Sequence, residues 1–229
     1  MIFKSKHMSN HIVKVLQTFY ITHDVKSFIV EKPANYNYTP GQATDVAIKL
    51  DDWEKEFRPF TFTSLTDDKY LQFMIKIYRD HEGVTKALEK TNIGHELIIQ
   101  EPFGTLQYKE KGTFIAAGTG ITPFLAIFRD LYKQNKLFGN KLIYTNKTSK
   151  DVIADEELKK MFKNEYLKVY TRENIVGFKE RRIDRYFLID YIANFNQHFY
   201  VCGPSDFVKN ITDILIELGA NPDALVIEE

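Results

Sequence analysis

The chain has 229 residues, with 31 lysines and arginines against 31 aspartates and glutamates and a single cysteine, Cys202. This length allows one large domain or two of about a hundred residues each. The balanced charge excludes an overall field that would attract nucleic acid or an acidic membrane surface. One thiol excludes an intrachain disulfide and a zinc or iron–sulfur site built from several cysteines.

Short β-prone runs fill the first half of the chain. They are rich in β-branched and aromatic residues, and turns such as Pro40-Gly41 separate them. The predicted strands are residues 12–16, 25–30, 43–50, 57–64, 70–78 and 96–100, and one short helix is predicted over 83–89. Six short strands with so little helix predict an antiparallel six-stranded β-barrel with Greek-key topology.

Strands and helices alternate in the second half. Predicted strands cover residues 113–117, 141–145, 166–170, 198–202 and 225–227, and predicted helices cover 121–135, 155–164, 182–193 and 205–219. Ser205 is the expected N-cap of the last helix. The alternation predicts a parallel sheet flanked by helices. Because the pattern changes near Lys109, we expect two domains, residues 1–110 and 111–229.

A glycine turn joins the first of these later strands to its helix, with the sequence Gly118-Thr119-Gly120-Ile121-Thr122-Pro123. Glycine permits positive φ, and proline suits the first turn of a helix. Backbone N–H groups and the positive helix end then point at the space above the turn, which suits a pyrophosphate. The alternative is a tight turn that needs glycine for backbone reasons alone.

Ligands of a parallel sheet gather at the carboxyl ends of its strands. One such end carries Cys202-Gly203-Pro204, where a small side chain and a glycine let a flat ring approach the backbone. Two others carry Thr145-Asn146-Lys147 and Thr171-Arg172-Glu173. Cations and hydroxyls at this place favour NADP(H) over NAD(H). Asp151 and Glu173 leave open the alternative of carboxylates that hold a ribose.

Two features of the first half could bind phosphate. Arg58 lies in an otherwise apolar β run, where an unpaired guanidinium is costly to bury. It is either an outward-facing edge residue or a fork that grips phosphate with two parallel hydrogen bonds. Gly83-Val84-Thr85 opens the short predicted helix and is a second candidate. The alternative for Thr85 is a cap or a solvated side chain.

Taken in order, these motifs resemble the ferredoxin–NADP reductase family, and in particular its single-chain flavodoxin/ferredoxin reductases. Arg58-Pro59-Phe60-Thr61 is similar to the family motif Arg-x-Tyr-Ser, in which the arginine grips the flavin pyrophosphate and the aromatic ring packs on the flavin. Ile77-Tyr78 resembles the strand end near the flavin's ribose and adenine. The glycine turn, Gly83 to Thr85 and Cys202 to Pro204 resemble the family's other nucleotide-binding segments.

The resemblance implies that FAD binds the barrel and that a nicotinamide nucleotide binds the second domain. Hydride would pass to flavin N5 and electrons would then leave singly to a protein acceptor. The resemblance implies catalytic roles for Thr61 beside flavin N5, for Cys202 against the nicotinamide and for Glu228 as a proton relay. A buried small side chain at Cys202 and a solvated acid at Glu228 are the alternatives.

The chain departs from the family pattern in three places. Phe60 stands for the usual tyrosine and lacks its hydroxyl, and Thr61 stands for serine with an added methyl. The sequence ends in Glu228-Glu229, where many relatives carry an aromatic residue that covers the flavin. We therefore expect the nicotinamide to reach the flavin without displacing a terminal ring.

The leading hypothesis is an FAD-dependent oxidoreductase that moves electrons between NADPH and a small acidic carrier such as flavodoxin or ferredoxin. The alternatives are an NADH-using flavin reductase component of an oxygenase or other electron-transfer system, and a non-catalytic nucleotide-binding module. An acidic carrier would need local cations, although a charge run is usually a solvated face. The candidates are Lys76, Arg79, Lys86, Lys179, Arg181, Arg182 and Arg185.

Nothing in the sequence indicates a membrane or secreted protein. No apolar run approaches the roughly 20 residues of a membrane span, and residues 1–10 lack a signal-peptide core. We expect a cytoplasmic monomer that binds no metal and no nucleic acid.

Overall fold

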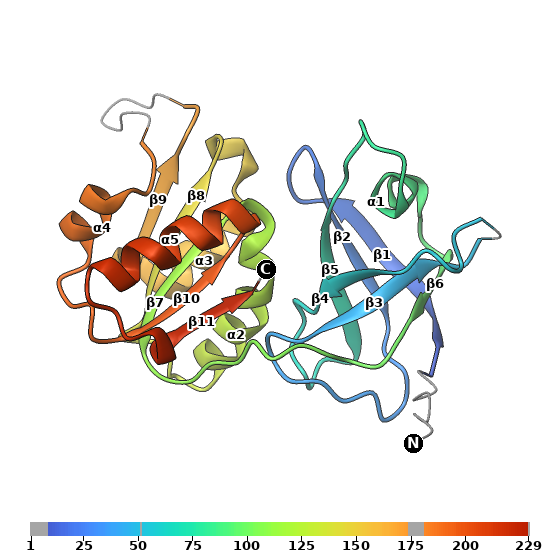
Figure 1. Ribbon diagram of the computed structural model, residues 1–229. Coiled ribbons are helices and arrows are strands. Elements are labelled where there is room, and N and C mark those ends of the chain that lie inside the picture. The colour runs from blue at the N-terminus through green and yellow to red at the C-terminus, as the bar shows by residue number, and fades with distance from the viewer. Residues whose placement is uncertain (1–8, 51, 174–180, 229) are drawn as a thin grey trace, which may run out of the picture.

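The computed structural model describes residues 9–50, 52–173 and 181–228. Its N-terminal strands form one body and its C-terminal strands and helices a second body beside it (Figure 1). The first body is a six-stranded antiparallel sheet in the order β4-β3-β6-β1-β2-β5. Its strands are β1 His11–Tyr20, β2 Val25–Glu31, β3 Ala43–Ile48, β4 Arg58–Thr61, β5 Tyr70–Lys76 and β6 Glu96–Ile99.

The two outer strands of this sheet, β4 and β5, meet just beyond the end of β4. There the Thr63 N–H donates a hydrogen bond of 2.9 Å to the Gln72 carbonyl, so the sheet closes into a near-barrel. β6 lies between β3 and β1, so a late strand returns to pair with strands that precede it by a long stretch of chain, as in a Greek key. The interior is apolar and includes fully buried Phe28, Phe62 and Phe73. This confirms the predicted barrel.

The second body is a five-stranded parallel sheet in the order β11-β10-β7-β8-β9. Its strands are β7 Gly112–Ala117, β8 Lys141–Asn146, β9 Tyr166–Tyr170, β10 His198–Cys202 and β11 Leu225–Glu228. With β7 counted as the first strand, the order is 3-2-1-4-5, in which the winding direction changes between β7 and β10. Ligands bind such sheets at this switch point, so the ends of β7 and β10 define the place for a site.

Helices cover both faces of the parallel sheet, as predicted. On one face, α2 Thr122–Lys133 and α3 Asp155–Phe162 share a core with β7 and β8, and this core also contains Val25, Met74 and Leu106 from the N-terminal part of the chain. On the other face, α4 Arg185–Tyr191 and α5 Ser205–Glu217 pack on a separate core. The barrel therefore packs against the α2 side of the sheet.

The short helices are α1 Val84–Ala87 and the 3-10 turns η1 Leu88–Lys90, η2 Gly118–Ile121, η3 Ser149–Asp151, η4 Lys163–Glu165 and η5 Pro222–Ala224. The turn after β7 is thus one turn of 3-10 helix that leads into α2. Among the described residues, none of the helices has the length and hydropathy needed to span a bilayer.

The predicted N-cap of the last helix is wrong by one residue. Pro204 is the N-cap of α5, and its carbonyl accepts the first helical hydrogen bond from the Val208 N–H at 3.0 Å. Ser205 is already helical, and its side chain makes no capping bond. The predicted helix over 182–193 is also shorter, because Asp184 caps α4 by accepting a hydrogen bond from the Phe187 N–H.

Candidate functional site

The two glycines of the turn after β7 have different structural roles. Gly118 has φ of +55°, and apart from its chain neighbours no described residue has an atom within 4 Å of the place that a Cβ would occupy. Gly120 has no such space, because a Cβ there would lie 2.5 Å from the Cys202 carbonyl oxygen. Gly120 therefore lets the turn pack against the end of β10, whereas Gly118 leaves open room above the turn.

Hydrogen bonds hold the turn in this shape. The Tyr144 hydroxyl, which lies on buried β8, donates to the Gly118 carbonyl at 2.8 Å. The Thr122 hydroxyl donates to the Thr119 carbonyl at 2.9 Å. Burial raises the pKa of Tyr144 well above its usual value, so the phenol stays a donor. Tyr144 belongs to no sequence motif, and its only signal in the sequence is a hydroxyl inside an apolar strand.

Cys202 and Glu228 stand opposite one another at the ends of the parallel strands β10 and β11. Burial, with a contribution from the nearby Glu228 carboxyl, raises the pKa of the Cys202 thiol to about 12, so it remains a neutral thiol. Burial also raises the pKa of Glu228 to about 7, and its Oε2 has no hydrogen-bond partner within the described chain. Glu228 is therefore not a fully solvated carboxyl.

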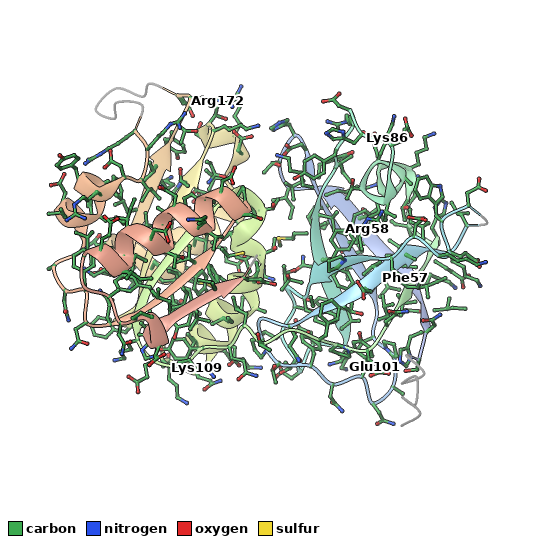
Figure 2. All side chains as sticks on the ribbon, in the orientation of Figure 1. Phe57, Arg58, Lys86, Glu101, Lys109 and Arg172 are labelled. Carbon is green, nitrogen blue, oxygen red and sulfur yellow. The ribbon has the colours of Figure 1, made fainter. Side chains whose placement is uncertain are left out.

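The carboxyl end of β11 points toward the barrel (Figure 1). On the barrel, β4 places Arg58 and Phe60 two residues apart and so on one face of the strand. The Arg58 side chain is 52% exposed, and it donates to the Phe57 carbonyl at 2.7 Å and pairs with Glu56 at 3.4 Å. Its guanidinium is therefore at the surface (Figure 2) and able to meet an anion.

The remaining residues of the Arg58 motif and its neighbours differ in what they offer a ligand. Pro59 is exposed, while Phe60 and Thr61 are half-buried. Ile77 is buried in the barrel core, so it can contribute only its backbone, whereas the adjacent Tyr78 is 45% exposed. Tyr78 therefore offers a ring surface to a ligand.

The second predicted phosphate segment lies at the start of α1. Gly83 is the N-cap, Val84 is buried in the barrel core, and Thr85 is half-buried. No side chain caps this four-residue helix. The capping alternative for Thr85 is thus wrong, and what the segment offers a ligand is its backbone and the Thr85 hydroxyl.

The ends of β8 and β9 lie beside one another, because the Arg172 N–H donates to the Lys147 carbonyl and the Thr171 N–H to the Asn146 carbonyl, both at 2.9 Å. Lys147 and Arg172 are exposed, and neither forms an ion pair with a described residue. Arg172 lies at the edge of the second body (Figure 2). Thr145 and Asn146 are buried, and Thr145 Oγ1 and both amide atoms of Asn146 have no partner in the described part of the chain.

The two acids that could hold a ribose at this edge are engaged elsewhere. Glu173 accepts hydrogen bonds from the backbone N–H of Ser149 and from its hydroxyl. Asp151 Oδ2 accepts from the N–H and the hydroxyl of Thr148, at 2.8 and 2.6 Å, and so closes the cap of η3. Lys147 and Arg172 are therefore the cations at these strand ends that have no ion-pair partner in the described part of the chain, which suits a phosphate.

Most cations predicted to dock an acidic partner are neutralised by acids of the same chain. The pairs are Lys76–Asp24 at 2.8 Å, Arg79–Glu89 at 2.7 Å, Lys86–Glu82 at 2.5 Å, Arg181–Asp190 at 2.9 Å and Arg185–Glu217 at 3.0 Å. Lys179 lies outside the described residues, and Arg182 is exposed. The five paired cations therefore contribute little net positive charge to the surfaces around them.

Two family models match the chain in sequence. Residues 12–108 match an oxidoreductase FAD-binding domain, and residues 114–213 match an oxidoreductase NAD-binding domain. The chain belongs to the ferredoxin–NADP reductase-like family, whose members are flavoenzyme reductases with FAD and a nicotinamide nucleotide. Both matched domains are oxidoreductase domains, one for FAD and one for a nicotinamide nucleotide, which argues against the non-catalytic alternative.

Curated relatives differ in the partners that their names give. The chain is 27% identical over 205 residues to a nitrate reductase [NADPH] of Beauveria bassiana, covering 76% of the chain and 23% of that protein. It is 23% identical over 225 residues to the glycine betaine monooxygenase reductase subunit of Chromohalobacter salexigens, covering 90% of the chain and 60% of that protein. The chain thus spans no more than about 60% of these relatives.

A solved structure matches over nearly the whole of both chains. It is a ferredoxin NADP+ reductase from Neisseria gonorrhoeae with bound FAD and NADP, with a TM-score of 0.81 and 18% identity. The match covers 96% of this chain and 98% of that one. At this identity the likeness shows that the two proteins share a fold.

Proposed function

We propose that the chain oxidises NADPH and passes the electrons to a small protein carrier such as flavodoxin or ferredoxin. The observation that carries the proposal is the arrangement at the switch point of the parallel sheet. The open turn at Gly118, the buried thiol of Cys202 and the high-pKa carboxyl of Glu228 lie at the ends of neighbouring strands. The whole-length likeness to a reductase that binds FAD and NADP supports this proposal.

The residues of the barrel fit FAD. The exposed Arg58 fork would hold the pyrophosphate, helped by the backbone of Gly83, Val84 and Thr85. Phe60 would pack against the flavin, and the Thr61 hydroxyl would donate a hydrogen bond to it. Tyr78, with Ile77 as its backbone neighbour, would lie against the adenosine part. Bound FAD supplies the step between a two-electron donor and a one-electron acceptor.

The residues of the parallel sheet fit the nicotinamide nucleotide. The turn of Gly118, Thr119 and Gly120, followed by Thr122 and Pro123 of α2, would hold the pyrophosphate. Cys202, Gly203 and Pro204 would bring the backbone close to the nicotinamide ring. Glu228 would hold a proton in a water-poor position and release it as the redox state changes.

We propose NADP(H) as the preferred nucleotide, because Lys147 and Arg172 form no ion pair with a described residue, while Glu173 and Asp151 accept hydrogen bonds from Ser149 and Thr148. Thr145, Asn146 and Thr171 complete this end of the site. In steady-state assays of the FAD-loaded chain, kcat/KM should be higher with NADPH than with NADH. A preference for NADH would contradict the proposal.

Charge removal tests the same proposal at the residues that carry it. The double variant Lys147→Ala/Arg172→Ala should lose about tenfold or more in kcat/KM for NADPH and little for NADH, because only NADPH carries the 2′-phosphate. Lys150→Ala is the matched control, since Lys150 is an exposed lysine of the same loop. Equal losses with both nucleotides would place these cations outside the phosphate site.

A second candidate function is a reductase component that serves an oxygenase. Two observations favour it: the similarity to a monooxygenase reductase subunit, and the pairing of the predicted docking cations with acids. A reductase component of this kind would not need a strongly positive docking surface.

We also propose a domain boundary between residues 110 and 111 and a cytoplasmic, monomeric protein.

A further inference from the structure

Arg129 of α2 uses all three guanidinium nitrogens: two bind α3 in its own body, and the third reaches across to the barrel. Nε and Nη2 donate to the two carboxylate oxygens of Glu157 on α3, at 2.7 and 2.8 Å. Nη1 donates to the Thr63 carbonyl and, at 2.9 Å, to Oε1 of Gln72 on the barrel. The Arg129 side chain is only 18% exposed. A bidentate, partly buried pair of this kind is far more rigid than a surface ion pair.

The barrel side of this contact is itself fixed. The Thr63 N–H donates to the Gln72 carbonyl in the bond that closes the barrel, and the Thr63 hydroxyl donates to Gln72 Oε1 at 3.0 Å. The Gln72 amide nitrogen also donates to the Ser27 hydroxyl at 3.1 Å. Because Thr63 follows Thr61 by two residues, Arg129 grips the chain directly beyond the strand proposed to face the flavin.

On the side of the parallel sheet, helix α2 connects Arg129 directly to the proposed nucleotide turn. α2 begins at Thr122, immediately after the Gly118 turn, and Arg129 lies about two turns further along it. The intervening side chains Phe124, Leu125 and Phe128 are fully buried, so this stretch of helix is held along its length. A shift at Arg129 would move the turn with it.

We propose that Arg129 is a positioning residue that sets the separation between the flavin-binding strand β4 and the nucleotide turn. The inference rests on the proposed function, because it assigns these two segments to the two cofactors. Hydride transfer is sensitive to displacements of about 1 Å, which can cost roughly a hundredfold in rate. Loss of the Arg129 contacts should thus slow hydride transfer while leaving each cofactor's own contacts in place.

The first test measures the separation of the two bodies directly and needs no activity. Spin labels at Ile93→Cys on the barrel side and Phe138→Cys on the sheet side occupy exposed positions, and the native Cys202 is buried and neutral. Pulsed electron spin resonance on the FAD-loaded chain should give a narrow distance distribution for the parent protein. Arg129→Met should broaden or lengthen it. An unchanged distribution would overturn the proposal.

The second test measures hydride transfer in single-turnover stopped-flow at saturating NADPH. Arg129→Met should slow flavin reduction by about tenfold or more, with an NADPH dissociation constant within about threefold of the parent value. Arg129→Lys retains one charged donor and should recover part of the rate. If Arg129→Met does not fold, Glu157→Gln tests the same contact and should give a smaller loss.

Lys133→Met is the matched control. Lys133 lies on the same helix and pairs with Asp67 of the barrel, but both side chains are more than half exposed. It should leave the distance distribution and the rate near the parent values. Equal effects of Lys133→Met and Arg129→Met would overturn a special role for Arg129. Failure of the parent to be reduced by NADPH would instead refute the proposed function, while the distance test would still decide the role of Arg129.

Discussion

At the scale of single residues, Glu228 is the group whose surroundings differ most from those that its sequence position indicates. A glutamate next to the end of the sequence is ordinarily solvated, but this one is half-buried, its Oε2 is out of reach of solvent, and burial raises its pKa to about 7. It stands opposite Cys202, whose thiol is held neutral by the same apolar surroundings. A carboxyl that is protonated in part of the molecules at neutral pH is suited to give and take protons.

Glu228 should also leave a signature in the free energy of unfolding. Between the usual glutamate pKa of 4.5 and about 7, the native state binds one proton more than the unfolded chain. The free energy of unfolding therefore falls as pH rises through this window and levels off above it, by about 1–3 kcal/mol in total. Glu228→Gln should remove this fall.

Urea unfolding of the parent and of Glu228→Gln at about pH 4.5 and about pH 8 measures the effect as a double difference, which cancels the pH dependence of all other groups. Parallel pH profiles for the two proteins would show that Glu228 ionises as a solvated carboxyl. Such a result would also remove the argument for a proton relay at this position.

From the sequence it is easier to predict which residues belong to the site than to predict which groups surround each of them. Arg58, Gly118 and Cys202 carry their signals in local motifs, because the proposed phosphate fork, the left-handed turn and the proposed close ring contact each need a particular residue. Tyr144 and Arg129 carry no such signal: one looks like an ordinary strand residue and the other like an ordinary polar helix residue. Their roles come from partners 26 and 66 positions away.

At the scale of elements, the packing of the β7 turn against the end of β10 shapes the proposed nucleotide site. Gly120→Ala would place a methyl group 2.5 Å from the Cys202 carbonyl oxygen and 2.6 Å from the Gly203 nitrogen, both of them backbone atoms. Since neither backbone can move cheaply, we expect a loss of about 2–4 kcal/mol in the free energy of unfolding. Thermal or urea unfolding measures it.

Gly118→Ala is the matched variant in the same turn. Its Cβ would meet no atom within 4 Å, so the cost is only that of a left-handed alanine, about 1 kcal/mol. We expect it to weaken NADPH binding more than its small stability loss explains, because the methyl group would occupy the open space above the turn. A larger stability loss for Gly118→Ala than for Gly120→Ala would contradict this division of roles.

Most elements could be predicted from the sequence because apolar residues recur every two positions in a strand and about every 3.6 positions in a helix. The alternation in β5 and the helical spacing in α2 are read from side chains alone. The ends of helices were harder, as Ser205 shows: serine is a good N-cap, but the chain already turns at Pro204, whose carbonyl opens the helix. The closure of the barrel through Thr63 and Gln72 joins segments whose pairing no local pattern encodes.

At the scale of the whole molecule, the distribution of charge bears on the partner. Lys76, Arg79 and Lys86 were expected to attract an acidic carrier, but each has an acidic neighbour within 3 Å. The Lys76–Asp24 pair could not be predicted from the sequence, because these two residues meet only through the pairing of β2 with β5. Balanced pairs contribute little long-range field.

Electron transfer from the reduced chain to flavodoxin or ferredoxin should therefore depend weakly on ionic strength. Between roughly 20 and 500 mM salt we expect the second-order rate constant to change by no more than about threefold. Stopped-flow measurement at several salt concentrations tests this. A tenfold or steeper fall would contradict it and would indicate a concentrated positive docking surface.

The most direct test of the central claim is anaerobic mixing of the FAD-loaded chain with NADPH, followed by flavin absorbance in a single turnover. The chain should bind one FAD, and NADPH should bleach the flavin within the first turnover, faster than NADH does. Absence of FAD binding, or a flavin that stays oxidised with both nucleotides, would contradict the assignment of the barrel and the parallel sheet to the two halves of one redox site.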